Sequence, residues 1–519
     1  MFLKKKTMAL CLLLSCNLSL TYANVGQPIR LSGPYPALAS PMVAGEDTST
    51  YSYTITNLTG IPIGVSQSIT GNSSSVIVSR PCQTVPAHGS CNFVVSVTPS
   101  IADALDNGNI TDTVKVTYNG RLPKQLTSPI HVTVTEPALS SITITPSSST
   151  VLGGSFVPYK AVGVYSNGAV LDITKYVNWS STNSNVAIFP TKSVFNSHGT
   201  AFAVSGGGTG GNASATITAT RKAQTSNSAT LNVNDYVFIA NRVAFTGTTV
   251  SSCFLNQAVV TALSLNPCNA QTGAPFPFTG PGNIAVNPAG TIAYVTNTGS
   301  QSVSYCSINV NTGALTNCKS TGNGFYQPVG ITVSNDNRFA YVSDYNNGLI
   351  TCPINRTTGA LSNCIANNTG IVFPQAIAIH PKQSYVYVSN AGYYIYYCAI
   401  NLVTGSVSNC LEIDSSANYA NALTIHPKGT YLYFAQTGSN NVLYCPIQSN
   451  GSLGTCLSAN GSNSFNGLIG LSIQPNGTNM YLTTSNTNEV YVCPMNGNIL
   501  GTCVVQSQPG GTPWGITAR

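Results

Sequence analysis

A repeat of about 46 residues in the second half of the chain limits the possible folds more than any other sequence feature. Each copy has an apolar triplet, a turn, a strand with a central Tyr, a strand with a Cys, and a second Cys. The Tyr residues lie 46 to 48 residues apart, at Tyr294, Tyr341, Tyr387, Tyr433 and Tyr481. Four short strands per unit of this length are typical of a β-propeller blade. An all-β propeller is therefore predicted for residues 235–519.

A partial sixth copy predicts how the propeller closes. Tyr236–Ala240 matches the Tyr strand and Val250–Leu255 matches the Cys strand, but this copy has no apolar triplet of its own. Gly515–Ala518, at the C-terminus, is a strand that contains such a triplet and has no copy after it. Joining the two completes six blades and removes the open edge between the first and last sheets.

The cysteines predict one disulfide in each blade. Two of the sixteen Cys residues, Cys11 and Cys16, lie in the N-terminal leader, which leaves an even number for pairing. Cys residues on both sides of a hairpin turn face each other at disulfide distance. Structural zinc is disfavoured because no blade offers four ligands in C-x-x-C spacing. The predicted pairs are Cys82/Cys91, Cys253/Cys268, Cys306/Cys318, Cys352/Cys364, Cys398/Cys410, Cys445/Cys456 and Cys493/Cys503.

Residues 1–23 are predicted to be a signal peptide. Lys4–Lys6 form a charged start, Met8–Leu14 form a short apolar run, and Ala23 precedes the expected cleavage point. Leu13–Cys16 also fits a lipobox, so a lipid anchor at Cys16 is the alternative. Both readings predict an exported protein, extracellular, on the cell surface or periplasmic, and so does the cysteine content. No later run is long enough for a transmembrane segment.

Three segments resemble known families. Ala161–Gly168 and Trp179–Asn183 make residues 137–234 similar to bacterial Ig-like group 2 domains, which implies a spacer or adhesive stalk. Tyr53–Asn57 and the Cys82…Cys91 pair make residues 24–136 similar to ASH-type Ig-like modules. The fold class is therefore two Ig-like β-sandwiches followed by a six-bladed propeller. Ala293–Asn297 resembles the repeat of the YVTN-type, lactonase-like propellers, a family that includes lactonases, lyases and surface-layer proteins.

Charge and polar residues narrow the function. Only 6% of residues are charged, and no basic stripe suited to nucleic acid is present. Asn297, Asp344 and Asn390 end successive Tyr strands, where the resemblance implies polar groups around a central channel. Their oxygens could hold Ca²⁺, which is the one cofactor considered, or cap the following turns. His380 and His426 occupy equivalent turns and are interpreted as turn residues.

Aromatic residues precede the apolar triplets and form the candidate binding site. Flat rings beside amides and hydroxyls suit stacking on sugars or gripping a protein loop. The alternative is that these rings wedge between blades as packing. The candidates, besides Phe276 and Phe278, are Phe325, Tyr326, Phe373, Tyr419, Phe465 and Trp514.

These observations predict an exported binding protein whose propeller recognises a glycan or protein partner, with the Ig-like units as its stalk. A lactonase- or lyase-like enzyme with a divalent cation in the channel is the first alternative. A scaffold without any ligand is the second.

Overall fold

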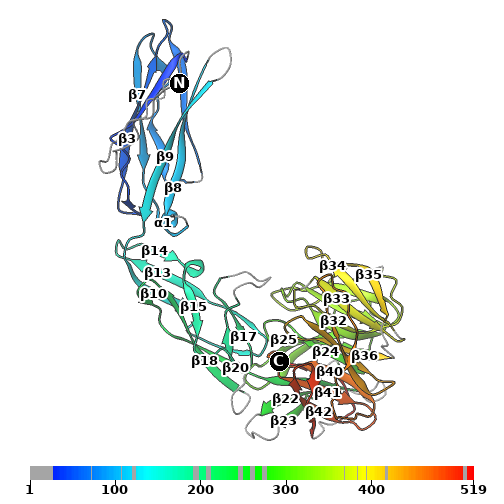
Figure 1. Cartoon of the computed structure of the whole chain (residues 1–519). Helices are drawn as coiled ribbons and strands as arrows, with labels where there is room; N and C mark the ends of the chain where they lie inside the picture. Colours follow the sequence, from blue (N-terminus) through cyan, green and yellow to red (C-terminus); the bar gives the residue numbers. More distant parts are fainter. Residues whose placement is uncertain are drawn as a thin grey trace, which may run out of the picture. The chain divides into compact units, whose positions relative to one another are not determined.

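The computed structural model (Figure 1) describes residues 27–519 except 72, 107, 120–123, 191–197, 206–211, 243–248, 257–263, 272–277, 368, 383, 393, 415–418 and 507–510. The predicted leader and Phe276 lie outside the described residues. The chain divides into two compact units, Met1–Ile142 with Val162–Asp172, and Thr143–Ala161 with Ile173–Arg519. No described helix is both long and apolar enough to cross a membrane.

The first module consists of two β-sheets around an apolar core. One sheet has the order β1 (Ile29–Tyr35), β3 (Ser49–Asn57), β7 (Ser90–Val97), β5 (Val76–Arg80). The other has the order β2 (Met42–Val43), β9 (Lys124–Thr135), β8 (Asn109–Tyr118), β4 (Ile63–Thr70), β6 (Thr84–Val85), and α1 (Ile101–Asp106) precedes β8. Tyr53 stacks on Phe93 inside, with ring centroids 5.2 Å apart.

The second module is also built from strands. Its sheets are β10 (Leu139–Thr145), β13 (Lys160–Tyr165), β14 (Val170–Asp172); β11 (Ser148–Leu152), β20 (Ala229–Asn234), β18 (Asn212–Arg221), β15 (Asn178–Ser181), with β19 (Gln224–Thr225) beside β18; and β12 (Phe156–Pro158), β17 (Thr200–Ala203), β16 (Ala187–Ile188). A 3₁₀ turn covers Thr174–Tyr176. Trp179 is half-buried, donates its Nε1–H to the Thr174 carbonyl at 3.1 Å, and stacks on Phe189.

The described residues from Tyr236 onward form six sheets. The first has the order β23 (Ser264–Gln271), β22 (Thr249–Asn256), β21 (Tyr236–Asn241), β45 (Pro513–Ala518). The second sheet is β24 (Pro281–Val286), β25 (Ile292–Asn297), β26 (Ser302–Ile308), β27 (Leu315–Thr321), and the third is β28 (Pro328–Val333), β29 (Phe339–Asp344), β30 (Gly348–Pro353), β31 (Ile365–Asn367). The fourth is β32 (Pro374–Ile379), β33 (Tyr385–Asn390), β34 (Tyr394–Ile400), β35 (Val407–Asp414), and the fifth is β36 (Ala420–Ile425), β37 (Tyr431–Gln436), β38 (Asn441–Pro446), β39 (Leu457–Ser458). The sixth is β40 (Leu468–Ile473), β41 (Asn479–Thr484), β42 (Val490–Asn496), β43 (Ile499–Leu500), and β44 (Val504–Gln506) also pairs with β42.

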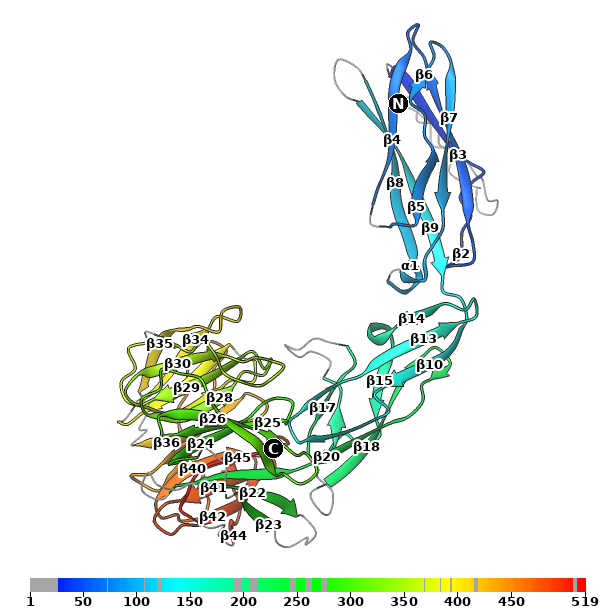
Figure 2. The same cartoon turned by 180° about the vertical axis from the view of Figure 1, so that it is seen from behind.

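The sheets surround their inner strands as in a β-propeller (Figures 1 and 2). Each of the inner strands β24, β28, β32, β36 and β40 packs beside the next, and β45 lies between β40 and β24. The C-terminal strand pairs with β21 in the register Val237↔Ala518 to Ala240↔Gly515, as the sequence predicts. The residue after it closes this end, because Arg519 and Tyr236 exchange two backbone hydrogen bonds.

Disulfides link a strand to the next strand or to the segment directly before it. The described pairs in the propeller have Cα–Cα distances of 4.0 to 4.2 Å, and the Cys82–Cys91 pair has 6.2 Å. They are Cys306–Cys318, Cys352–Cys364, Cys398–Cys410, Cys445–Cys456 and Cys493–Cys503. Cys253 lies opposite Cys268 in the ladder of β22 and β23. Each bridge secures an outer strand that would otherwise present a weakly held edge.

Two of the repeated Tyr residues connect neighbouring sheets through the same hydrogen bond. The Tyr294 hydroxyl, on β25, donates to the Gly359 carbonyl in the hairpin turn of the following sheet at 2.7 Å. Tyr387 makes the same bond to Gly451 at 2.7 Å. A buried Tyr hydroxyl usually finds a hydrogen-bond partner, and at these two positions the hairpin turn of the next sheet supplies it.

A buried carboxylate links the second module to the propeller inside the second unit. Asp235 lies between β20 and β21 and is almost completely buried. Its Oδ2 accepts hydrogen bonds from the Ser205 hydroxyl at 2.5 Å and from the Gln474 amide at 2.8 Å. Charge-assisted bonds of this kind are the stronger hydrogen bonds in proteins, so they stabilise this junction.

Candidate functional site

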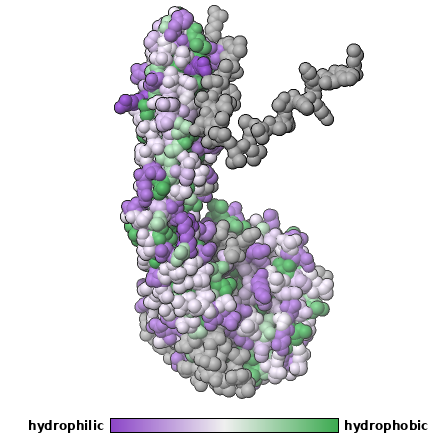
Figure 3. Space-filling view, turned by 60° about the vertical axis from the view of Figure 1, so that its left-hand side comes forward, coloured by the Kyte–Doolittle hydropathy of each residue, from purple (hydrophilic) through white to green (hydrophobic). Residues whose placement is uncertain are grey.

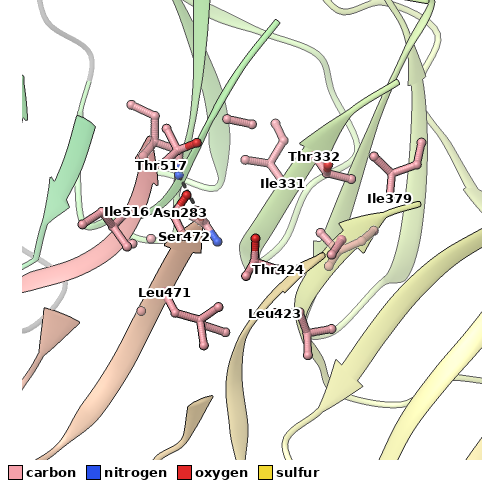
Figure 4. A pocket seen from close by; sticks show the side chains of 18 of the residues that line it. Asn283, Ile331, Thr332, Ile379, Leu423, Thr424, Leu471, Ser472, Ile516 and Thr517 are labelled. Carbon is pink, nitrogen blue, oxygen red and sulfur yellow. Dashed lines mark hydrogen bonds between the residues drawn. The ribbon is translucent and has the colours of Figure 1, made fainter. Parts of the chain in front are cut away.

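The inner strands enclose a cavity of about 210 Å³ along the centre of the propeller. The middle residues of the apolar triplets line it, and most of them are small or carry a hydroxyl. Figure 4 shows four of them, on β28, β36, β40 and β45. The full set is Ala285, Thr332, Ala378, Thr424, Ser472 and Thr517.

Neutral side chains dominate this lining. Asn283, Gln375 and Asn421 contribute amides, and Trp514 contributes an indole ring. Arg519 is the one charged residue among the described lining residues. Neutral hydrogen-bonding groups of this kind can hold water or a small polar molecule.

Buried hydroxyls join the inner strands of adjacent sheets. Thr296 accepts a hydrogen bond from the Asn283 N–H at 2.8 Å and donates to the Val329 carbonyl of the next sheet at 2.8 Å. Ser343 accepts from Gly330 N–H and donates to the Gln375 carbonyl in the same way. The sequence carries a signal for this, because a hydroxyl residue follows the repeated Tyr by two positions in four copies: Thr296, Ser343, Ser389 and Thr483.

Two of the polar residues that end the Tyr strands organise the loops beside them. Asp344 is fully buried, and its carboxylate accepts four backbone hydrogen bonds of 2.7 to 3.2 Å. The donors are the N–H groups of Tyr326, Gln327, Asn346 and Asn347.

Of the two flanking positions, Asn390 acts in a similar way and Asn297 does not. Asn390 accepts from the N–H groups of Gly392 at 3.1 Å and Tyr394 at 3.2 Å. Asn297 donates to the Ser304 hydroxyl at 2.8 Å. No described group of three or more His, Cys, Asp or Glu residues is arranged to hold a metal ion. Calcium at Asn297, Asp344 and Asn390 therefore stays a prediction. Asp344 and Asn390 already bind loop N–H groups. Asn297 contacts strand residues instead, and its Oδ1 is buried without a hydrogen-bond partner among the described residues.

The predicted aromatic residues fall into two structural classes. In the first class, an apolar side chain three positions before the inner strand is buried between sheets. Phe325 packs against Ile331 and Cys352, and Phe465 meets Tyr491 edge-on at 5.2 Å. This burial agrees with the alternative that the rings pack between blades. Its described members are Phe278, Phe325, Ile371 and Phe465.

In the second class, an aromatic residue directly before the inner strand is exposed. Phe373 and Tyr419 have exposed fractions of 50% and 47%, and both have left-handed backbone, with φ of 52° and 57°. Gly280 and Gly467 hold this position in two other sheets, with φ of 59° and 74°. A bulky residue with positive φ is a true outlier, with a cost of about 1–2 kcal/mol.

Tyr326 and Trp514 complete the predicted set. Tyr326 is 56% exposed, on the loop whose N–H groups bind Asp344. Trp514 is partly buried in the cavity wall, and the Arg242 guanidinium lies 4.5 Å from its ring centroid, a cation–π distance. Tyr345, which the sequence analysis missed, contacts Phe373 with ring centroids 4.9 Å apart.

The exposed Tyr326, Phe373 and Tyr419 and the partly buried Tyr345 lie in loops at one end of the sheets. Loops before inner strands and loops after the antiparallel second strands meet at the same end. We name Tyr326, Tyr345, Phe373 and Tyr419 the aromatic loop cluster. In Figure 3 the visible surface is mostly pale, as expected for Gly-, Ser- and Thr-rich sequence, and strongly hydrophobic residues appear in separate patches.

The two propeller histidines cap turns. His380 is buried, its Nδ1 accepts the Lys382 N–H at 3.1 Å, and its Nε2 lies 3.1 Å from the Gly429 carbonyl. These partners select the neutral ring with hydrogen on Nε2. Burial lowers the pKa of His380 below its usual value, and burial also lowers the pKa of His426.

Acid is therefore expected to destabilise the propeller. Above a pH of about 6.5, the usual His pKa, the ring is neutral in the folded and the unfolded chain. The contribution of His380 to the free energy of unfolding is then fully present. As the pH falls, the unfolded chain binds a proton first, so the free energy of unfolding decreases. Urea unfolding at pH 7.5 and 5.5 should show this, and His380→Gln should reduce the difference. Exposed His131→Gln is the control; equal pH dependence of the two variants would contradict the prediction.

Comparison with known families adds to this geometry. A family model described as a lactonase, 7-bladed beta-propeller, matches residues 259–412, less than half of the chain. The strand arrangement is that of a β-propeller, and the match shows that part of this propeller is similar to the lactonase family.

Individual relatives are distant. Ice-binding protein 1 of Shewanella frigidimarina is 30% identical over 150 residues, which are 28% of this chain and 15% of that protein. The Pseudomonas aeruginosa periplasmic gluconolactonase has a TM-score of 0.39 at 11% identity, covering 55% of this chain and 99% of that one. A putative 6-phosphogluconolactonase from Bacteroides uniformis has a TM-score of 0.38 at 14% identity, covering 52% and 81%. These TM-scores are below 0.5, so the two structures say nothing about activity here.

Proposed function

We propose that the protein is an exported binding protein with a six-bladed propeller, and that the aromatic loop cluster contacts its ligand. The two N-terminal modules, as Ig-like units, act as the stalk. The ligand is a glycan or a protein loop, since both present surfaces on which flat rings stack.

One observation carries this proposal. Phe373 and Tyr419 are exposed and keep a backbone conformation that glycine adopts without strain. Their rings add little core packing in exchange, because about half of each side chain meets solvent. Strained residues that the rest of a fold maintains concentrate at ligand-binding sites.

The proposal predicts opposite effects on stability and binding. Phe373→Gly and Tyr419→Gly remove the strain, so the free energy of unfolding should stay constant or rise by up to about 1 kcal/mol. The affinity for a glycan identified on an array, or for a protein partner, should fall at least tenfold. Leu411→Gly, at an exposed site on outer strand β35, is the control for losing a surface apolar group.

Two results would contradict this role of the cluster. One is glycan or partner binding that the double variant keeps at full strength. The other is a large loss of stability in both glycine variants, which would make the rings structural.

An enzyme is the second candidate, and the lactonase family match favours it. A lactone panel assayed with and without added divalent cation tests it, with Asp344→Asn as the variant. Turnover that this variant abolishes, while the protein stays folded, would replace binding as the function. Because one relative is named an ice-binding protein, an ice-recrystallisation assay on the full chain is a further test of function.

A further inference from the structure

Asp112 is a carboxylate on the core face of a β-sheet in the first module. Along β8, the buried positions alternate and hold Ile110, Val114, Val116 and Tyr118, with Asp112 among them at 1% exposure. An ionised carboxylate in such a place is costly unless hydrogen bonds or an opposite charge compensate it.

The described residues leave half of this carboxylate uncompensated. Its Oδ1 accepts one long hydrogen bond from the Ser73 N–H at 3.5 Å. Its Oδ2 is buried and has no hydrogen-bond partner, and no described Lys, Arg or His forms an ion pair with it. Native proteins rarely leave a buried charged oxygen unpaired, and an ion is one of the standard explanations.

Other oxygen ligands surround the same loop. The Ser73 hydroxyl lies 3.3 Å from Asp103 Oδ1, and the Ser75 hydroxyl lies 2.5 Å from Asp103 Oδ2. Asp103 also caps α1 through the N–H and hydroxyl of Ser100, both at 2.8 Å. Ser73 therefore connects two carboxylates, one on α1 and one on β8.

The backbone opposite Asp112 is shaped to its carboxylate. A Cβ atom on Gly71 would lie 1.7 Å from Asp112 Oδ1, so any other residue would displace the carboxylate. The absence of a side chain at this position keeps Asp112 directed at the loop that contains Ser73.

We propose that Asp112 is a ligand of a calcium ion in the first module, with Asp103 and Ser73 beside it. The donors are all oxygens, which excludes a preference for zinc or copper. Two carboxylates fall short of a complete coordination shell, so carbonyl and water oxygens supply the rest. Calcium accepts such irregular sets of six to eight oxygens, whereas magnesium requires near-octahedral geometry.

Calorimetric titration of the metal-free full chain with CaCl₂ tests this directly. One ion should bind to each chain in the first module, with affinity in the range of about 10⁻⁶ to 10⁻³ M. Calcium should also slow hydrogen exchange in residues 109–118, which is a local readout in the intact protein. Asp112→Asn should weaken binding at least tenfold, and Glu46→Gln, which removes an exposed carboxylate of the same module, should not.

Each outcome either supports or overturns the calcium site. No calcium binding by the wild-type chain up to about 10 mM, above the range of extracellular calcium modules, would overturn the proposal. Equal affinity for magnesium, or unchanged affinity in Asp112→Asn, would overturn it as well. If that variant does not fold, Ser73→Ala and the wild-type exchange data still give the answer. The outcome is independent of ligand binding at the aromatic loop cluster.

Discussion

A chain that lacks residues 513–519 is expected to lose the cooperative folding of its propeller. These residues include β45, whose removal exposes the inner edge of β21 and opens the packing between β24 and β40. Its ladder hydrogen bonds contribute about 1 kcal/mol each, and burial of Ile516 adds about 2 kcal/mol. Their sum approaches the whole net stability of a domain, about 5–15 kcal/mol.

Limited proteolysis and size-exclusion chromatography would show this loss. A synthetic peptide of residues 511–519 should restore protease resistance when added in trans, and a scrambled peptide should not. A truncated chain that melts at the wild-type temperature would contradict closure of the ring by this strand.

Removal of one blade disulfide is expected to be the next largest effect. Cys352→Ala with Cys364→Ala opens a link between residues 12 positions apart. The free energy of unfolding should fall by about 2–4 kcal/mol, since the unfolded chain regains the freedom that the link removes.

Urea unfolding of this double variant and the wild type, each with and without reductant, measures the effect. Reductant should lower the stability of both proteins, because the other bridges remain in the variant. A difference below about 0.5 kcal/mol between the two oxidised proteins would show that the bridge does not stabilise the fold.

The repeated features of the propeller could be predicted from the sequence because each recurs at a fixed spacing. Predicted Val250–Leu255 lies within β22, and predicted Tyr236–Ala240 lies within β21. The disulfide pairs could also be predicted, because the two Cys residues of each pair flank a hairpin turn. The pairing of the C-terminal strand followed from one copy that lacked an inner strand.

The surface of the candidate site could not be predicted in the same way. Phe325 and Phe373 both precede inner strands, yet one is buried and the other exposed. Phe325 lies three positions before its inner strand, whereas Phe373 lies one position before its own and has a left-handed backbone. These two differences decide which way each ring points. Spacing alone does not reveal backbone conformation at a non-glycine residue.

Asp112 was not singled out from the sequence, for a different reason. The alternation in Asn109–Tyr118 places it on the apolar face, which a pattern analysis of this strand would have revealed. Its uncompensated oxygen depends on the loop at Gly71 and Ser73, which only the three-dimensional structure brings beside it.

Mass mapping of peptides under non-reducing conditions tests the architecture most directly. Digestion of the full-length protein should release Cys306 linked to Cys318, Cys352 to Cys364, and every other blade pair within its own sheet. Peptides joined between different sheets, or free thiols at these positions, would contradict a propeller whose blades each carry their own bridge.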